Sequence, residues 1–308
     1  MNHFNGATVL VVGGEGFIGQ HLVSKLCNLK AYVVSLGTKV HSETKAHKYL
    51  SVDIRDKGRL ASLLKEFDFE YIFNFCGYIN HTPYFKNGRD VIDVHFIGLL
   101  NLLDQTCGSQ LKCFVNVGSS DEYGDNVSPQ NEAMREDAIS PYSVAKVAET
   151  QLIQTLAKTE NFPGVVVRPF LVYGPGQNMS RFIPQVISGC LEDLDFPVSK
   201  GEQLRDFCFI EDIIEGVLLA ATKKDALGEV INLASGNPTS ICSIIKEVVG
   251  ITGGGRPQWG GVSYRIGENM RLYADITKAK RILKWKPKTT IKEGLKETVD
   301  FYKKIKLL

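Results

Sequence analysis

The chain has 308 residues, 44% of them hydrophobic and 23% charged, which is the composition of an ordinary globular protein with a large core. Its net charge of +2, without long like-charge blocks, gives no reason to expect a nucleic-acid partner, and its apolar runs are too short to span a membrane. The seven cysteines form no CxxC pair, and the first strand pattern begins almost at Met1 without a signal-type leader, so we expect a cytoplasmic protein.

Strand and helix patterns alternate through about the first half of the chain. Apolar runs predict strands at residues 7–12, 31–36, 71–75, 113–117 and 164–168. Amphipathic stretches between them predict helices at residues 17–27, 56–67, 91–107 and 142–158. This order predicts an α/β fold in which helices cover both faces of a doubly wound parallel sheet.

The pattern becomes irregular after Arg168. Four prolines break it, and a glycine-rich stretch occupies residues 250–261. Two further helices are predicted at residues 275–283 and 291–304.

The stretch "GGEGFIG", residues 13–19, stands between the first strand and the first helix. Glycines at this point permit a tight turn and a close approach of the backbone to a pyrophosphate, which then lies at a helix N-terminus. The spacing Gly13, Gly16, Gly19 is GxxGxxG. A purely structural turn is the alternative, but the strand–turn–helix context favours a dinucleotide site.

The stretch "SPYSVAK" places Tyr142 and Lys146 four residues apart. If Ser140 caps a helix whose first residue is Pro141, both side chains lie on one helix face. A nearby ammonium, together with an oxidised nicotinamide, favours the phenolate and lowers the tyrosine pKa from about 10. The phenol can then exchange a proton with an alcohol oxygen while hydride moves at carbon. Taken alone, the same spacing also fits a surface pair.

Hydroxyl and carboxylate side chains follow the strand at residues 113–117, in "VGSSDEYG". Ligands of open parallel sheets bind beyond the carboxyl ends of the strands, so these side chains are candidates for substrate contacts. Capping and turn formation are the alternative roles of such residues.

These three motifs, in this order, resemble the extended short-chain dehydrogenase/reductase family of nucleotide-sugar epimerases, dehydratases and reductases. The similarity continues in "DIRD" (53–56), "VRPFLVYGPGQ" (167–177), "GEQLRDF" (201–207) and "LKWKP" (283–287). It implies a Rossmann domain at residues 1–168 and a smaller α/β domain for a nucleoside-diphosphate sugar, formed mainly by residues 169–308, with some segments returning to the Rossmann sheet. It also implies a homodimer, paired through helices 91–107 and 142–158.

The resemblance implies a set of site residues. Ser119 would be the catalytic hydroxyl, Tyr142 the acid/base, and Lys146 the residue that holds the nicotinamide ribose and tunes the tyrosine. The cofactor contacts would be Gly13, Gly16, Phe17, Ile18, Gly19, Thr38, Lys39, Asp53, Ile54, Tyr142 and Lys146, with Asp53 and Ile54 beside the adenine. The substrate contacts would be Ser119, Ser120, Asp121, Arg205 and Arg265, with the two arginines at the sugar diphosphate. Each arginine has the alternative of a solvated ion-pair partner, and His95 is either a cofactor contact or a core residue.

The cofactor prediction depends on the residue after the second strand. Family members that prefer NAD have an acidic residue there, and the matching position is Gly37, followed by Thr38 and Lys39. We find no carboxylate near it in the sequence, and an ammonium attracts a 2'-phosphate. NADPH is therefore the preferred cofactor, with NAD(H) possible. Lys39 as a solvated loop charge is the alternative.

The resemblance leaves three reactions to distinguish: dehydration, 4-ketoreduction and 4-epimerisation. The dehydratases of the family have Thr-Asp-Glu where this chain has Ser119, Ser120 and Asp121, so dehydration is not expected. The later segments are most similar to NADPH-dependent 4-ketoreductases that make deoxyhexoses on dTDP or CDP, which is the preferred function. A nucleotide-sugar 4-epimerase is the alternative, and a non-catalytic NADP(H)-binding protein a minor one. No metal-ligand spacing is present in the sequence, and no metal is expected.

Overall fold

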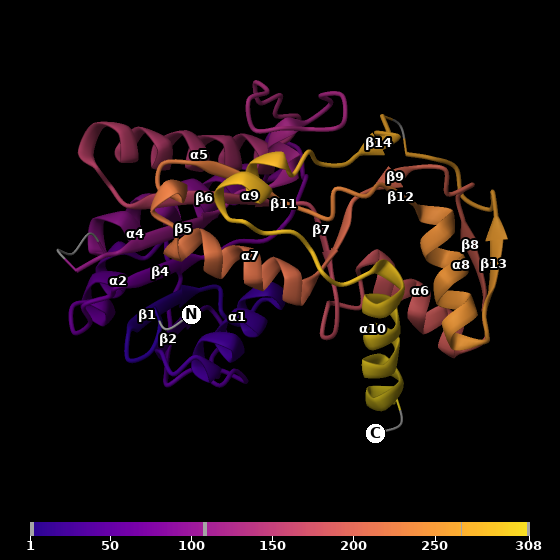
Figure 1. Ribbon diagram of the computed structural model, residues 1–308, viewed down its shortest axis with the longest axis horizontal. Helices are drawn as coiled ribbons and strands as arrows, with labels where there is room; N and C mark the ends of the chain where they lie inside the picture. Colours follow the sequence, from indigo (N-terminus) through magenta and orange to yellow (C-terminus); the bar gives the residue numbers. More distant parts are fainter. Residues whose placement is uncertain (1–2, 107–109, 266, 307–308) are drawn as a thin grey trace.

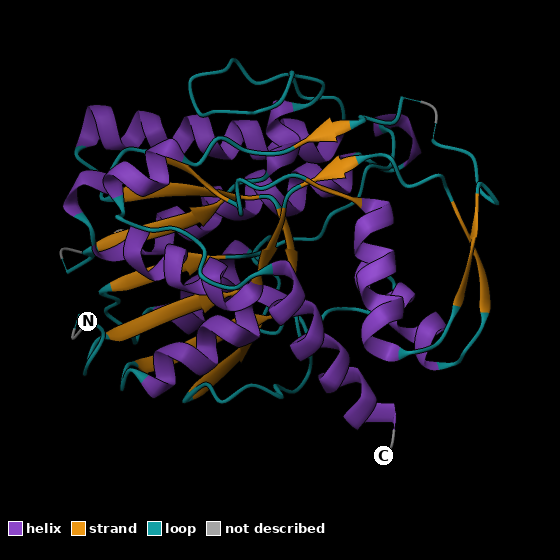
Figure 2. Ribbon diagram, turned by 45° about the vertical axis from the view of Figure 1, so that its right-hand side comes forward, coloured by secondary structure: helices purple, strands orange, loops and turns teal. Residues whose placement is uncertain are grey.

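The computed structural model describes residues 3–106, 110–265 and 267–306 and is built around a seven-stranded parallel sheet (Figures 1 and 2). The strand order is β11-β6-β5-β4-β1-β2-β3. Its strands are β1 (Thr8–Val12), β2 (Tyr32–Gly37), β3 (Lys48–Ser51), β4 (Tyr71–Asn74), β5 (Cys113–Val117), β6 (Gly164–Pro169) and β11 (Val230–Leu233). Because the order reverses between β1 and β4, their carboxyl ends flank a crevice where ligands of such sheets bind.

Helices cover both faces of this sheet. On one face α1 (Phe17–Asn28) packs beside α7 (Ile210–Thr222), and the buried apolar residues of both belong to one core cluster. On the other face lie α2 (Lys57–Leu64), α4 (Gly98–Thr106) and α5 (Pro141–Glu160). The strands are apolar on both faces because both are covered, as expected for a parallel sheet.

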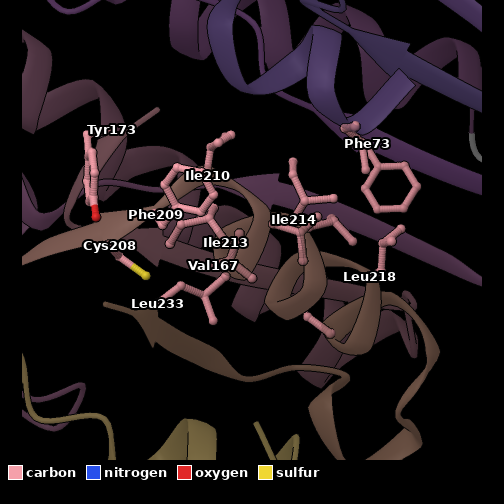
Figure 3. Close-up of a cluster of buried hydrophobic side chains, with 14 of the residues drawn as sticks. Phe73, Val167, Tyr173, Cys208, Phe209, Ile210, Ile213, Ile214, Leu218 and Leu233 are labelled. Atoms are coloured by element: carbon pink, nitrogen blue, oxygen red, sulfur yellow. The ribbon is translucent and has the colours of Figure 1, made fainter. Parts of the chain in front are cut away.

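The largest core cluster joins the sheet to α7 (Figure 3). Val167 of β6 and Leu233 of β11 lie against Ile213 and Ile214 of the helix, and all four are fully buried. Each such side chain contributes about 1.5–3 kcal/mol of transfer free energy when buried. A helix from the second half of the chain therefore completes the core of the sheet formed mainly by the first half.

Most of the elements that follow β6 and lie outside the large sheet gather at one side of the molecule, beyond the carboxyl ends of the strands (Figure 1). The helices of this part are α6 (Phe182–Leu191), α8 (Ile241–Thr252) and α10 (Ile291–Lys306). Helix α9 (Thr277–Ile282) instead packs against β11 of the large sheet. The small sheets pair β7 (Leu171–Tyr173) with β10 (Phe207–Phe209), β8 (Asp195–Val198) with β13 (Arg256–Trp259), and β9 (Leu204–Arg205) with both β12 (Thr239–Ser240) and β14 (Arg271–Leu272).

The predicted α/β fold with a parallel sheet is confirmed, and the five predicted strands are all present. The predicted helix at residues 91–107 is interrupted: α3 (Arg89–Ile92) and α4 flank a π-helical segment, η2 (Asp93–Ile97). Residue 107 lies outside the described residues. The irregular region also contains α6, α7 and α8, which its prolines concealed. The domain boundary at residue 168 stays a prediction, and β11 shows that the chain crosses back into the large sheet after it.

Short 3-10 turns complete the described chain: η1 (Tyr84–Lys86), η3 (Ser120–Tyr123) and η4 (Lys224–Ala226). Within the described residues, none of the helices combines the length and the apolar character needed to cross a bilayer.

Candidate active site

The glycine turn between β1 and α1 is packed too tightly for side chains. Gly13 has a φ of +76°, and a Cβ there would lie 2.5 Å from the Phe75 carbonyl oxygen. A Cβ on Gly19 would lie 2.2 Å from the carbonyl oxygen of Gly13. Helix α1 begins at Phe17, and its N-cap, Gly16, makes no side-chain capping bond. The turn therefore fits a pyrophosphate, which can accept hydrogen bonds from the first N–H groups of the helix, including those of Phe17 and Ile18.

The segment after β3 contains the two residues assigned to the adenine. Ile54 is buried against Gly98 at the start of α4. The Asp53 carboxylate accepts a bond of 2.6 Å from Nη2 of Arg55, and this interaction lowers the pKa of Asp53. Arg55 also binds Asp90 at 2.5 Å. Asp53 thus lies shortly after the edge strand β3. It is held by Arg55, which was not among the predicted site residues.

The end of β2 differs from the sequence prediction. Thr38 and Lys39 are exposed there, but Lys39 Nζ lies 4.0 Å from a carboxylate oxygen of Glu15, which comes from the glycine turn. The inference that no carboxylate stands near Gly37 is therefore wrong. It failed because the neighbour is 22 positions earlier in the chain and is brought close by the pairing of β1 with β2.

Ser119 and Tyr142 meet at the carboxyl end of β5. Ser119 caps η3, where its Oγ accepts a bond of 3.1 Å from the Asp121 backbone N–H. Tyr142 occupies the first turn of α5, whose N-cap is Ser140 and whose first residue is Pro141, as predicted. The Ser119 hydroxyl lies close enough to the Tyr142 phenol to lower the pKa of that phenol. The two groups can therefore share one oxygen of a bound alcohol or ketone.

Lys146 lies one helical turn beyond Tyr142 and is 2% exposed. Its ammonium donates to the Val117 carbonyl oxygen at 2.9 Å and to Oε2 of Glu149 at 3.0 Å. Glu149 in turn accepts from the Asn116 amide at 3.0 Å and lies 3.5 Å from Nδ1 of His95. An ammonium has three N–H donors, so a further one can reach a ribose hydroxyl. A buried network thus fixes the lysine beneath the tyrosine.

The pKa of the Tyr142 phenol is set by opposing effects. Burial raises this pKa, while the Lys146 ammonium and the bond with Ser119 lower it, and the net shift is upward. In the chain by itself, desolvation outweighs the attraction of an ammonium already paired with Glu149. The lowering expected from the sequence includes the charge of an oxidised nicotinamide and stays a prediction. For Lys146, burial lowers the pKa, but Glu149 and Tyr142 more than offset it.

The substrate side of Tyr142 contains one carboxylate that faces outward. Asp121 is bound by Nε2 of His81 at 2.7 Å, and the His81 ring lies 5.8 Å from the Tyr142 ring. Arg265 is exposed, and its charge reaches His81, as does that of Arg181. Asp121 and His81 therefore lie beside Tyr142, and the charges of Arg181 and Arg265 are near enough to act on His81.

The neighbours of Asp121 point elsewhere. Ser120 is 6% exposed, and Glu122 is fully buried, bonded to Arg168 at 2.6 Å and to the Thr150 hydroxyl at 2.7 Å. The adjacent carboxylates of Asp121 and Glu122 therefore lie in different surroundings, one beside His81 and the other inside the core.

Arg205, on β9, is largely buried, and its guanidinium binds the carboxylate of Glu268. Glu268 also donates its backbone N–H to the Arg265 carbonyl oxygen at 3.0 Å. Both arginines assigned to the sugar diphosphate thus belong to one structural unit, and an anion would compete with Glu268 for Arg205.

Several residues of the site were not found from the sequence: Glu15, His81, Glu149 and Arg181. His81 lies in the loop after β4, and its place beyond the carboxyl end of a parallel strand could have indicated a role in the site. Glu149 lies three residues after Lys146, on the same face of α5. His95 proves to be a buried residue in contact with the catalytic network, its ring 5.2 Å from that of Tyr142. Among the described residues, no group of three or more His, Cys, Asp or Glu side chains is arranged to hold a metal ion.

The pKa values of the two histidines beside Tyr142 are expected to be shifted in opposite directions. The hydrogen bond to Asp121 raises the pKa of His81 above 6.5, whereas burial lowers the pKa of His95 below it. NMR titration of the imidazole signals, assigned with His81→Gln and His95→Gln variants, measures both midpoints. Asp121→Asn should lower the His81 midpoint and leave that of His95 in place. If the His81 midpoint is the same in Asp121→Asn as in the wild type, the pairing of His81 with Asp121 is wrong.

Residues 9–234 of this chain match the NAD dependent epimerase/dehydratase family. A UDP-glucuronate 4-epimerase of Thermodesulfobacterium geofontis is 30% identical, over 96% of this chain and 95% of that protein. The structure of UDP-glucose 4-epimerase from Thermotoga maritima with UDP-glucose superposes with a TM-score of 0.89, at 27% identity, covering 97% of this chain and 99% of that one.

A further structure is that of UDP-glucuronic acid 4-epimerase from Bacillus cereus with UDP-glucuronic acid and NAD. It superposes with a TM-score of 0.84 at 27% identity, covering 97% of this chain and 99% of that one. The finer resemblance to 4-ketoreductases and the preference for NADPH find no support in these relatives. With the glycine turn, the tyrosine–lysine pair and the family match over residues 9–234, the chain belongs to the NAD-dependent epimerase/dehydratase family.

Proposed function

We propose that this protein is an NAD-dependent 4-epimerase of a nucleoside-diphosphate sugar. The observation that carries the proposal is the placement of Ser119, Tyr142 and the buried Lys146 together at the carboxyl end of β5, where Lys146 is held by the Val117 carbonyl oxygen and Glu149. This arrangement suits proton exchange at a single sugar hydroxyl. The names of the relatives, UDP-glucose and UDP-glucuronate 4-epimerases, support the same reaction.

In this reaction Tyr142 takes the proton of the sugar C4 hydroxyl and later returns it. Ser119 hydrogen-bonds the same oxygen, and Lys146 supplies positive charge below the phenol. Bound NAD supplies the hydride acceptor and donor at C4 and a positive charge that further favours the phenolate. Inversion requires the ketone to turn over between the two transfers, so that its opposite face meets the cofactor.

Dehydration is less compatible with the site. It needs an acid and a base that act together at C5 and C6, and of the two carboxylates in residues 119–122 Asp121 is the one bound by His81 beside Tyr142. The acid position is Ser120, and Glu122 is committed to Arg168 inside the core. The 4-ketoreductase hypothesis rested on the similarity of the later segments and agreed with the missing acid at the end of β2, and the Glu15 carboxylate beside Lys39 removes that agreement.

Incubation with UDP-glucose or UDP-glucuronic acid and catalytic NAD⁺ is expected to give the C4 epimer. Proton NMR of the anomeric region follows conversion, and absorbance at 340 nm should show no net accumulation of NADH, because the hydride returns to the sugar. The parallel arm offers NADPH and a dTDP-4-keto-6-deoxyhexose. If that arm consumes NADPH while the first stays inert, the protein is a 4-ketoreductase. Inertness in both arms favours a non-catalytic binding protein.

A further inference from the structure

The side chain of Glu15 occupies the space beside the end of β2. A Cβ built on Gly37 would lie 3.7 Å from Cγ of Glu15 and 3.2 Å from the Tyr49 hydroxyl oxygen. A side chain at position 37 would therefore meet Glu15. The glutamate fills, from the glycine turn, the volume into which an acidic residue at position 37 would project.

The Glu15 carboxylate is held in place by the loop after β2. Oε1 accepts a bond of 2.5 Å from the Ser42 hydroxyl, and Oε2 accepts one of 3.3 Å from the Glu43 backbone N–H. The side chain is only 8% exposed. Because these bonds come from the loop that follows β2, the carboxylate is positioned at the strand end where the adenosine ribose of a Rossmann cofactor binds.

The charges near this position also favour one cofactor. Lys39, the one basic residue that the sequence suggested for a 2'-phosphate, is 55% exposed and lies 4.0 Å from Glu15. Glu15, Lys39 and the exposed Glu43 line one cleft of about 310 Å³. A phosphate brought there would meet the carboxylate of Glu15 at short range, and a ribose hydroxyl would find an acceptor.

We infer that Glu15 is the residue that selects NAD(H) over NADP(H), by accepting a hydrogen bond from the adenosine ribose and repelling a 2'-phosphate. The inference deepens the proposed function, since it rests on the glycine turn binding a dinucleotide. It concerns cofactor affinity alone and does not depend on which sugar reaction follows.

The test is the ratio of the dissociation constants for NADP⁺ and NAD⁺, measured by isothermal titration calorimetry without sugar. The wild-type protein should bind NAD⁺ more tightly. In Glu15→Gln this preference should fall by about tenfold or more, the size of a lost charge-assisted hydrogen bond plus relieved repulsion. The amide keeps the shape of the side chain, and thermal midpoints check folding. Since each ratio is measured within one protein sample, a reduced folded fraction does not imitate the result.

Two matched variants complete the experiment. Glu66→Gln removes the same charge from an exposed residue outside this cleft and should leave the ratio unchanged. Lys39→Met should alter it less than Glu15→Gln does. A tighter NADP⁺ complex in the wild type, an unchanged ratio in Glu15→Gln, or an equal change in Glu66→Gln overturns the inference. If the wild-type protein prefers NAD⁺, Glu15→Gln reduces that preference, and the wild type shows no epimerase activity, the proposed function is wrong and Glu15 remains the selecting residue.

Discussion

Replacing Tyr142 by Phe is expected to lower kcat for epimerisation by about 10²- to 10⁴-fold, because it removes the group that exchanges a proton with the sugar hydroxyl. The ring would still pack against those of His81 and His95, so binding of the nucleotide sugar should change little. Steady-state kinetics and calorimetric titration of the sugar nucleotide separate the two effects.

Two further variants sharpen this result. Ser119→Ala removes one of two partners of the reacting oxygen and should cost less, about 10²-fold. Tyr32→Phe removes the hydroxyl of a half-exposed tyrosine on β2 and should leave kcat unchanged. If Tyr142→Phe turned over at the rate of Tyr32→Phe, Tyr142 would not be the acid/base.

Replacing Arg168 by Met is expected to destabilise the fold by about 3–5 kcal/mol, the usual cost of stranding a buried charge. Arg168 is fully buried, bonded to Glu122 at 2.6 Å and to Glu136 at 2.7 Å, and it lies over the Tyr123 ring. Without it, Glu122 stays in the core with the Thr150 hydroxyl and the Ser119 backbone N–H as partners. Urea denaturation measures the loss.

The stability lost in Arg168→Met should depend on pH. Burial raises the pKa of Glu122 above its unfolded value, and Arg168 opposes that rise, so the variant should raise the pKa further. The folded state then holds the proton more tightly than the unfolded state, and stability falls as pH increases. The loss should be smaller at about pH 5 than at about pH 8. Arg256→Met, at an exposed ion pair, is the control, and a loss no larger than its loss contradicts the prediction.

The first half of the fold was predictable because each strand and helix there has a complete local pattern. Strand β3 was missed because it is a short edge strand with exposed Lys48, and α7 because prolines in the preceding region obscured its start. Strand β11 was missed because it is only four residues long, includes the polar Asn232, follows an irregular segment and pairs with a strand some 60 residues earlier.

The candidate site was predictable where its residues form local motifs. The glycine turn and the Tyr142–Lys146 spacing are legible within a few positions. The roles of Glu15 and Glu149 are not, because they arise from contacts with Ser42 and with Asn116 and His95, which only the folded sheet brings together. For the same reason, the balance between burial and the ammonium at Tyr142 needed the surrounding network.

The position of β11 has a consequence for synthesis on the ribosome. This strand pairs with β6 at the edge of the large sheet, and it lies some 60 residues further along the chain. Until it emerges, the nascent chain presents the open edge of β6 and lacks the apolar cover of α7, the state in which strand edges recruit other chains. Fragments that stop near residue 168 should therefore aggregate or be degraded, and co-expression of residues 169–308 offers the missing strand in trans.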